Sequence, residues 1–148
     1  MPSPLIQRLT AELGYPVLDE HALDAFLAAQ RHSLLFFTED PARYPESNDV
    51  AVVLPELMQV FGQGCAAAVI DRAAEKALQR RFGFNAWPAL VVMRGTGYLG
   101  AITRVQDWRV YLEELDALFD GAVRRPPGIG VPLVEEPAGG CRREGVSP

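Results

Sequence analysis

Cysteine and histidine are scarce in this 148-residue sequence, which contains only Cys65, Cys141, His21 and His32. This scarcity excludes a disulfide-rich scaffold and a structural zinc site with four Cys or His ligands at a normal spacing. No Cys-x-x-Cys pair and no Gly-x-Ser-x-Gly nucleophile motif occurs. The sequence therefore lacks the patterns typical of metal binding and of nucleophilic catalysis, and we expect no cofactor and no catalytic residue.

Long apolar runs and an excess of basic charge are also missing. No run approaches the roughly 18 apolar residues of a membrane-spanning helix. The first residues lack the basic-then-apolar build of a signal peptide. The net charge is −5 at pH 7, which disfavours general nucleic-acid binding. We expect a cytoplasmic protein that neither spans a membrane nor binds nucleic acid.

The composition is that of an ordinary globular domain, with 49% hydrophobic and 22% charged residues. The last 25 residues are different, because they hold five glycines and five prolines. Such a segment buries too little apolar surface to offset its ordering entropy. We predict one domain over residues 1–123 and a flexible tail over 124–148, in which a short apolar stretch, 129–134, is able to dock on the domain.

Apolar periodicity in the domain alternates between the helical and the extended pattern. Asp19 is the expected N-cap of the second helix, Asn48 or Asp49 that of the third, and Pro55 lies inside the third. Three expected helices cover 5–13, 73–82 and 105–119. The second expected helix follows Asp19 and carries Leu23, Phe26 and Leu27, and the third follows its cap and carries Val52, Val53, Leu57, Val60 and Phe61. The expected strands cover 15–18, 33–38, 66–70, 89–93 and 98–102. Strands joined through helices favour parallel pairing, and the last two form an antiparallel hairpin. The fold class is an α/β sandwich with one mixed sheet between helices.

A glycine pattern in the expected hairpin, Gly95-Thr-Gly97-Tyr-Leu-Gly100, matches the dinucleotide-binding fingerprint. That fingerprint also requires the last glycine to open a helix, whereas here a strand is expected. We interpret the glycines as hairpin residues with positive φ. Cys65 opens a buried strand and is interpreted as a small core residue.

The second half of the domain resembles a thioredoxin. The shared pattern is Arg81-Phe-Gly83, then Trp87-Pro88 directly before an apolar strand, then Gly97-Tyr-Leu-Gly100 and a final amphipathic helix. In thioredoxins the corresponding proline is cis and faces the redox site. An aromatic residue before proline raises the chance of a cis bond, and the sequence leaves the isomer of Trp87-Pro88 open. Counting back from Pro55 places the two redox cysteines near Ser47 and Val50, so the resemblance implies a thioredoxin-like fold without a dithiol.

The segment that replaces the dithiol motif is Asp40-Pro-Ala-Arg43-Tyr-Pro-Glu46-Ser-Asn-Asp49. It is similar to the Asp-Pro-x-Arg-x-Pro-Glu-x-x-Asp stretch of the hydrogenase accessory proteins called HyaE, HupG or HoxO, and the resemblance covers roughly residues 5–120. The resemblance implies a non-enzymatic chaperone for the small, iron–sulfur subunit precursor of an uptake [NiFe] hydrogenase. It also implies binding of that precursor's twin-arginine signal peptide before export, with other hydrogenase accessory proteins as further candidate partners.

A local excess of acid fits such a partner, because residues 19–56 carry a net charge of −6 (eight acidic and two basic side chains). Carboxylates form strong charge-assisted hydrogen bonds with arginine. We therefore predict a partner-binding surface made of Asp40, Arg43, Glu46, Asp49, Trp87 and Pro88. Two simpler interpretations stay open, a solvated acidic face and a pairing of Arg43 with Glu46 or Asp49 that holds the loop.

Two other function classes also stay open. The first is a thiol oxidoreductase that uses Cys65 alone, without a resolving thiol. The second is a general interaction module that pairs through the edge of its sheet.

Overall fold

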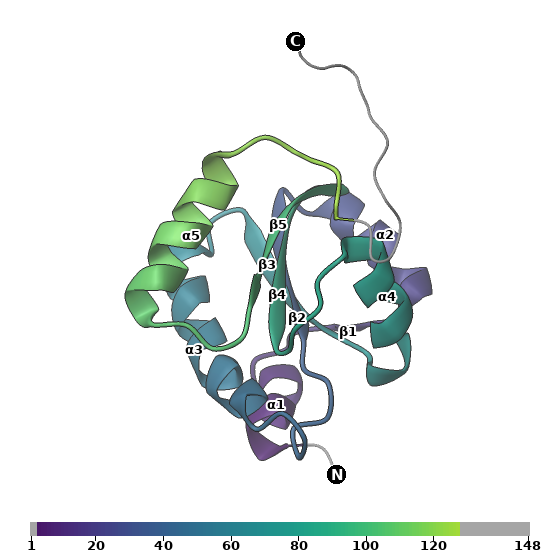
Figure 1. Cartoon of the computed structure of the whole chain (residues 1–148), viewed down its shortest axis with the longest axis vertical. Coiled ribbons are helices and arrows are strands. Elements are labelled where there is room, and N and C mark those ends of the chain that lie inside the picture. Colours follow the sequence, from purple (N-terminus) through teal and green to yellow (C-terminus); the bar gives the residue numbers. More distant parts are fainter. Residues whose placement is uncertain (1–2, 128–148) are drawn as a thin grey trace.

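The computed structural model describes residues 3–127, and its elements alternate as the sequence predicts (Figure 1). In chain order they are α1 (Pro4–Ala11), β1 (Val17–Leu18), α2 (Glu20–Ala29), β2 (His32–Phe37), α3 (Glu46–Phe61), β3 (Cys65–Ile70), a 3-10 turn (Arg72–Ala74), α4 (Glu75–Phe82), β4 (Ala89–Arg94), β5 (Gly97–Thr103) and α5 (Trp108–Asp120).

The five strands form one mixed sheet in the order β1-β3-β2-β4-β5. The strand β3 is parallel to both of its neighbours, whereas β4 is antiparallel to β2 and to β5. The predicted parallel core and terminal hairpin are thus confirmed. Because β2 lies in the centre, its five residues Ser33–Phe37 are all buried, which explains the continuous apolar run in the sequence.

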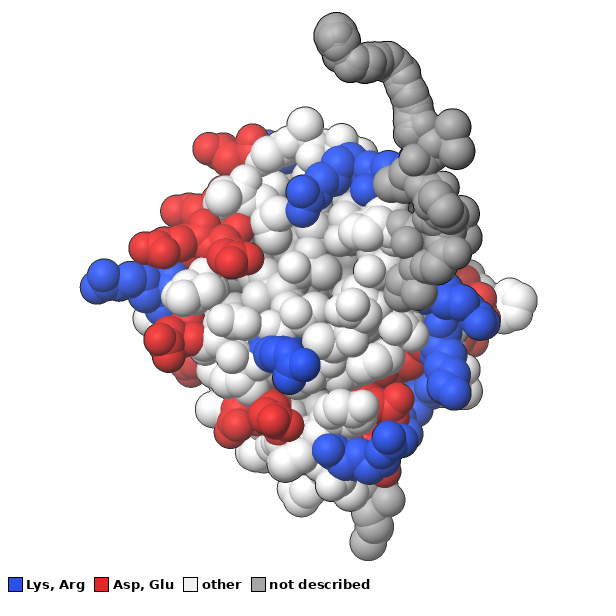
Figure 2. Space-filling model, in the orientation of Figure 1, with Lys and Arg blue, Asp and Glu red and all other residues white. Residues whose placement is uncertain are grey.

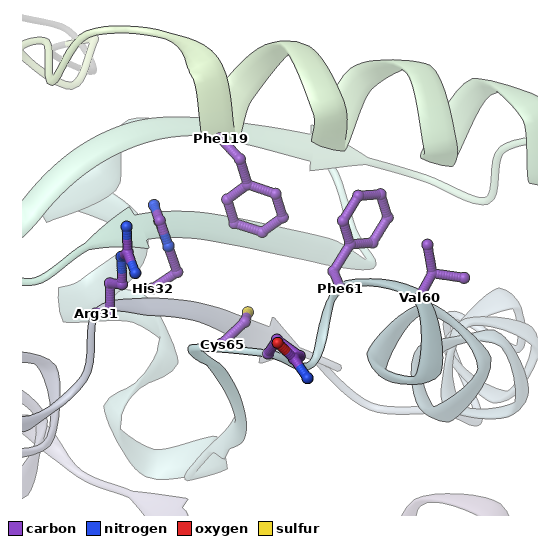
Figure 3. A pocket seen from close by; sticks show the side chains of 7 residues that line it. Arg31, His32, Val60, Phe61, Cys65 and Phe119 are labelled. Atoms are coloured by element: carbon purple, nitrogen blue, oxygen red, sulfur yellow. The ribbon is translucent and has the colours of Figure 1, made fainter.

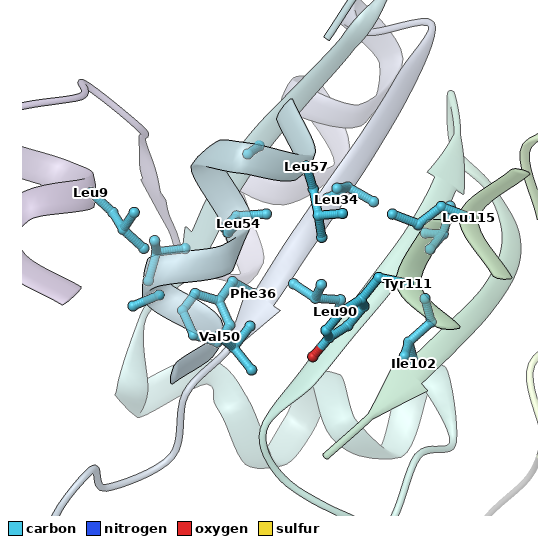
Figure 4. Packing of buried hydrophobic residues seen from close by; sticks show 14 of the residues in the cluster. Leu9, Leu34, Phe36, Val50, Leu54, Leu57, Leu90, Ile102, Tyr111 and Leu115 are labelled. Atoms are coloured by element: carbon cyan, nitrogen blue, oxygen red, sulfur yellow. The ribbon is translucent and has the colours of Figure 1, made fainter. Parts of the chain in front are cut away.

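Helices cover both faces of the sheet, with α1, α3 and α5 on one side and α2 and α4 on the other (Figure 1). The first layer contains a cluster in which Leu54 of α3 and Tyr111 of α5 pack with Phe36 and Leu90 of the sheet (Figure 4). The second layer packs on the opposite sheet face, around Phe37 and Phe82. Among residues 3–127, no helix is both long and apolar enough to cross a lipid bilayer.

The start of α3 differs from the sequence prediction. The helix begins at Glu46 after Pro45, and neither Asn48 nor Asp49 caps it. Asn48 is instead held by tertiary structure, since its side-chain oxygen accepts a hydrogen bond from the Ser3 hydroxyl. The predicted cap was wrong because the fixed φ of proline starts this helix, and the asparagine ties α3 to the N-terminal segment.

The starts of two other helices also bear on the sequence predictions. Asp19 caps α2 as predicted, since its carboxylate accepts a hydrogen bond from the Ala22 amide at 2.8 Å. The helix α5 begins three residues later than predicted.

The hairpin between β4 and β5 confirms that the glycine pattern is not a dinucleotide loop. Gly95 has a φ of +54°, as a hairpin residue requires. Gly97 and Gly100 have a different role, because a Cβ atom there would meet the side chains of Val123, Leu118 and Arg124 at less than 3 Å. These glycines allow the end of α5 and the chain that follows it to lie directly against β5.

The first residues of the predicted tail pack on the domain. The Arg124 amide donates to Tyr98 O, and its Nε donates to Leu99 O, both at 2.9 Å. This segment covers part of the outer edge of β5, where unpaired backbone groups would otherwise face solvent. Residues 128–148 of the predicted tail, including 129–134, lie outside the described residues.

Candidate interaction site at the end of β2

The predicted partner-binding residues lie where β2 ends and β4 begins. The chain leaves β2 at Thr38, turns sharply at Glu39, which has a φ of +51°, and reaches α3 at Glu46. We call residues 39–49, which include this turn and the first turn of α3, the acidic loop. The segment before β4 lies beside it, since the ring centroids of Tyr44 and Trp87 are 6.1 Å apart. Trp87 is joined to Pro88 by a cis peptide bond.

A buried carboxylate anchors both segments. Glu75, in the first turn of α4, is only 2% exposed. Its two oxygens accept the Glu39 amide at 3.0 and 3.1 Å, and its Oε1 accepts the Trp87 indole N–H at 3.1 Å. One side chain therefore holds the start of the acidic loop and the residue before the cis proline in fixed positions.

Burial raises the pKa of the Glu75 carboxyl to about 7, although the hydrogen bonds from the Glu39 amide and the Trp87 indole favour its charged form. Local sequence patterns do not single out Glu75, because an acidic side chain in the first turn of a helix is common. Helical periodicity is the one sequence pattern that indicates its burial, because Glu75 shares the buried face of α4 with Leu78 and Phe82 at i+3 and i+7.

Asp40 and Arg43 have structural contacts of their own. The Asp40 carboxylate accepts the Ala42 amide at 3.0 Å, which is an Asx turn. The Arg43 guanidinium lies 5.7 Å above the Tyr44 ring, a cation–π distance. Within the part of the chain that the structure describes, no ion pair joins Arg43 to Glu46 or Asp49, so a pairing that holds the loop is not found there.

Glu46 and Asp49 both lie in the first turn of α3 and are exposed. Their negative charges are favourable there, because the helix N-terminus carries partial positive charge. Pro88 is buried, and Trp87 is half-buried between the Tyr44 and Phe84 rings. The six predicted residues thus comprise three exposed charges, one half-buried carboxylate and a partly covered indole next to a buried proline.

Ser47 and Val50, near which the count back from Pro55 places the thioredoxin cysteines, are both closed to solvent. Ser47 is fully buried and its hydroxyl donates to the Thr38 carbonyl, and Val50 is 2% exposed. Cys65 lies at the opposite end of the sheet, and burial raises the pKa of its thiol to about 12. No group of three or more His, Cys, Asp or Glu side chains able to hold a metal ion is found within residues 3–127.

Solved structures identify the class of fold. Mitochondrial thioredoxin 3 from Saccharomyces cerevisiae matches with a TM-score of 0.59 at 11% identity, covering 71% of this chain and 97% of the yeast protein. A crystal structure described as putative hydrogenase expression/formation protein HupG, from Rhodopseudomonas palustris, matches with a TM-score of 0.52 at 39% identity, covering 71% and 95%. The protein has a thioredoxin-like fold, as the sequence predicts.

Sequence comparison then gives the family. Residues 5–111 match the family described as hydrogenase-1 expression protein HyaE. The hydrogenase expression/formation protein HoxO of Azotobacter vinelandii is 49% identical over 138 residues, 93% of either chain. HupG of Rhizobium leguminosarum bv. viciae is 43% identical over 139 residues, 91% of this chain and 93% of that protein. The chain belongs to the HyaE family of hydrogenase expression proteins.

Proposed function

We propose that this protein is a non-enzymatic chaperone in the maturation of an uptake [NiFe] hydrogenase. In this proposal it works in the cytoplasm, where it binds the precursor of the small, iron–sulfur subunit at its twin-arginine signal peptide before export. Other hydrogenase accessory proteins are further candidate partners. Membership of the HyaE family supports the accessory role. The observation that carries the binding role is an exposed acidic surface beside Ser47 and Val50, two buried residues without a thiol near which the resemblance to thioredoxin places the dithiol.

The chemistry of the acidic loop suits an arginine-bearing peptide. Glu46 and Asp49 are exposed and have no ion-pair partner among the described residues. Carboxylates accept two parallel hydrogen bonds from a guanidinium, and opposite charges steer association. The half-buried Trp87, which contacts Tyr44 of the same loop, offers apolar surface to the segment that follows the arginines.

A pull-down of the small-subunit precursor tests the proposal. The variant Asp40→Asn, Glu46→Gln, Asp49→Asn removes three charges, and asparagine at position 40 keeps the oxygen that accepts the Ala42 amide. The control Glu12→Gln, Glu20→Gln, Glu114→Gln removes three exposed charges elsewhere. The proposal predicts loss of the precursor only with the first variant. Capture that is unchanged by the first variant, or by removal of both precursor arginines, would contradict it.

A thiol oxidoreductase using Cys65 is the second candidate, but the structure offers it little support. A thiol with a pKa near 12 is almost entirely protonated at neutral pH and is a poor nucleophile. Insulin reduction, with Cys65→Ser as the control, tests this candidate. Turnover that depends on Cys65 would show enzymatic activity.

A general interaction module that pairs through its sheet edge is the third candidate. The Arg124 contacts already occupy part of the β5 edge. Cross-linking in cells, followed by identification of the linked residues, separates an edge contact from a contact at the acidic loop.

A further inference from the structure

Two aromatic rings mark a second surface, at the opposite end of α3 from the acidic loop. Phe61 is the last residue of α3, and its ring centroid lies 5.4 Å from that of Phe119 near the end of α5. Phe119 also meets His32 of β2 edge-on at 5.0 Å. Both phenylalanines are half-buried, and Figure 3 shows Phe119 between His32 and Phe61.

The aromatic pair contributes to the lining of two hollows of different charge. The first hollow, of about 360 Å³, is lined by Arg31, His32 and Cys65 as well as the two rings. The second, of about 540 Å³, has Phe61, Phe119 and Ala117 as its apolar lining and Glu113, Asp116 and Asp120 as its polar lining. We call this second space the α3/α5 hollow. A lining that combines aromatic rings with three carboxylates suits an apolar segment that also carries positive charge.

The fold concentrates acid on this side of the molecule. The helix α5 holds four acidic residues and one basic residue, Arg109, whereas α4 holds Lys76, Arg80 and Arg81. Figure 2 shows the consequence, with Asp and Glu gathered over α5 and Lys and Arg over α4. Residues 57–123 carry seven acidic and seven basic side chains, and this balance along the sequence conceals two surfaces of opposite sign.

The position of these carboxylates is unfavourable for the free chain. Asp120 ends α5 and the last turn contains no basic residue, although the helix C-terminus favours positive charge. Asp116 and Asp120 are four residues apart, a spacing at which like charges repel. Within residues 3–127, none of the three hollow carboxylates takes part in an ion pair. A bound cationic group would relieve this repulsion.

We propose that the α3/α5 hollow is a docking site for an apolar peptide segment of a partner protein that carries arginine or lysine. The apolar side chains of the segment pack on Phe61 and Phe119, and its cationic groups pair with Glu113, Asp116 and Asp120. The site is separate from the acidic loop, because the 16 residues of α3 span about 24 Å. It therefore does not rest on the proposed function of the loop.

Fluorescence anisotropy with a labelled synthetic peptide tests the site, using two adjacent arginines followed by a leucine- and alanine-rich run as the probe. The variant Asp116→Asn, Asp120→Asn should weaken binding about tenfold or more and leave the melting temperature unchanged or higher. Glu114→Gln is the matched control, since Glu114 is an exposed acid of α5 that does not line the hollow. A variant that binds the probe as tightly as the wild type would overturn the proposal.

Two further outcomes separate this site from its competitors. Loss of probe binding with the acidic-loop variant alone, and not with Asp116→Asn, Asp120→Asn, would overturn the α3/α5 site and leave the loop proposal intact. The basic surface of α4 also makes a second copy of this chain a competing occupant. Concentration-dependent self-association in sedimentation, abolished by Asp116→Asn, Asp120→Asn, would show that occupant and overturn the peptide proposal.

Discussion

The indole N–H of Trp87 donates a 3.1 Å hydrogen bond to the buried carboxylate of Glu75. The same carboxylate accepts the amide of Glu39, the first residue of the acidic loop. Two segments separated by almost fifty residues in sequence thus share one anchor on α4. The geometry of the candidate site depends on this contact more than on ion pairs within the loop.

Removal of the anchor should destabilise the domain. The substitution Glu75→Ala leaves the Glu39 amide and the Trp87 indole without their acceptor, and each unsatisfied buried donor costs about 1–3 kcal/mol. We expect a loss of about 2 kcal/mol or more in the free energy of unfolding, measured with urea at about pH 5.5, where Glu75 is uncharged. Lys76→Ala, at an exposed neighbouring position, should change the same quantity by less than about 0.5 kcal/mol. Equal effects of the two substitutions would contradict the anchor.

The same carboxyl should make stability depend on pH. Its pKa is raised in the folded state, from 4.5 to about 7, so the folded chain keeps this proton to higher pH than the unfolded chain. Its contribution to the free energy of unfolding is constant below about pH 4.5, falls by about 3 kcal/mol as the pH rises to about 7, and is constant above. Urea unfolding of the wild type and of Glu75→Gln across this range isolates the contribution. A difference between the two proteins that does not change with pH would show that Glu75 is not perturbed.

Two buried serines should respond in opposite ways to alanine. Ser47 donates its hydroxyl to the Thr38 carbonyl, so Ser47→Ala should cost about 1 kcal/mol. Ser33 is buried in the central strand, and its hydroxyl has no hydrogen-bond partner among the described residues, so Ser33→Ala should be neutral or stabilising. Thermal unfolding of both variants measures the difference. A larger loss for Ser33→Ala would contradict these hydrogen-bond assignments.

Cys65 should react slowly with alkylating reagents. A pKa raised from 9.0 to about 12 lowers the thiolate population about a thousandfold at neutral or mildly alkaline pH. We expect iodoacetamide labelling of Cys65 in a Cys141→Ser background to be slow in the folded protein and fast in urea, as followed by mass spectrometry. Rapid labelling of the folded protein would reopen the oxidoreductase alternative.

The fold could be predicted from the sequence because the patterns that specify its strands and helix ends are local and recur along the chain. Apolar runs mark Ser33–Phe37 and Ala66–Ile70 as buried strands, and Gly83 ends α4 in the left-handed conformation that glycine favours. The start of α3 was missed, because the contact that occupies Asn48 comes from Ser3, 45 residues away. Capping preferences describe a helix and its neighbours, and a tertiary contact of this kind overrides them.

The candidate site was harder to predict from the sequence, because its main contacts join segments that are far apart along the chain. The sequence marks Asp40, Glu46 and Asp49 as an acidic segment, but it does not show that Glu75 accepts the hydrogen bonds of the Glu39 amide and the Trp87 indole. Local charge counts also fail for α4 and α5, whose charges cancel along the chain and separate in space. Only the fold reveals which charges share a surface.

Titration calorimetry of the small-subunit precursor into this protein is the decisive test of the acidic loop as its binding surface. We expect saturable binding that weakens with added salt, and that is at least about tenfold weaker for the variant Asp40→Asn, Glu46→Gln, Asp49→Asn. The charge-matched control Glu12→Gln, Glu20→Gln, Glu114→Gln should bind like the wild type. Equal affinity of the loop variant and the wild type would contradict binding of the precursor at the acidic loop.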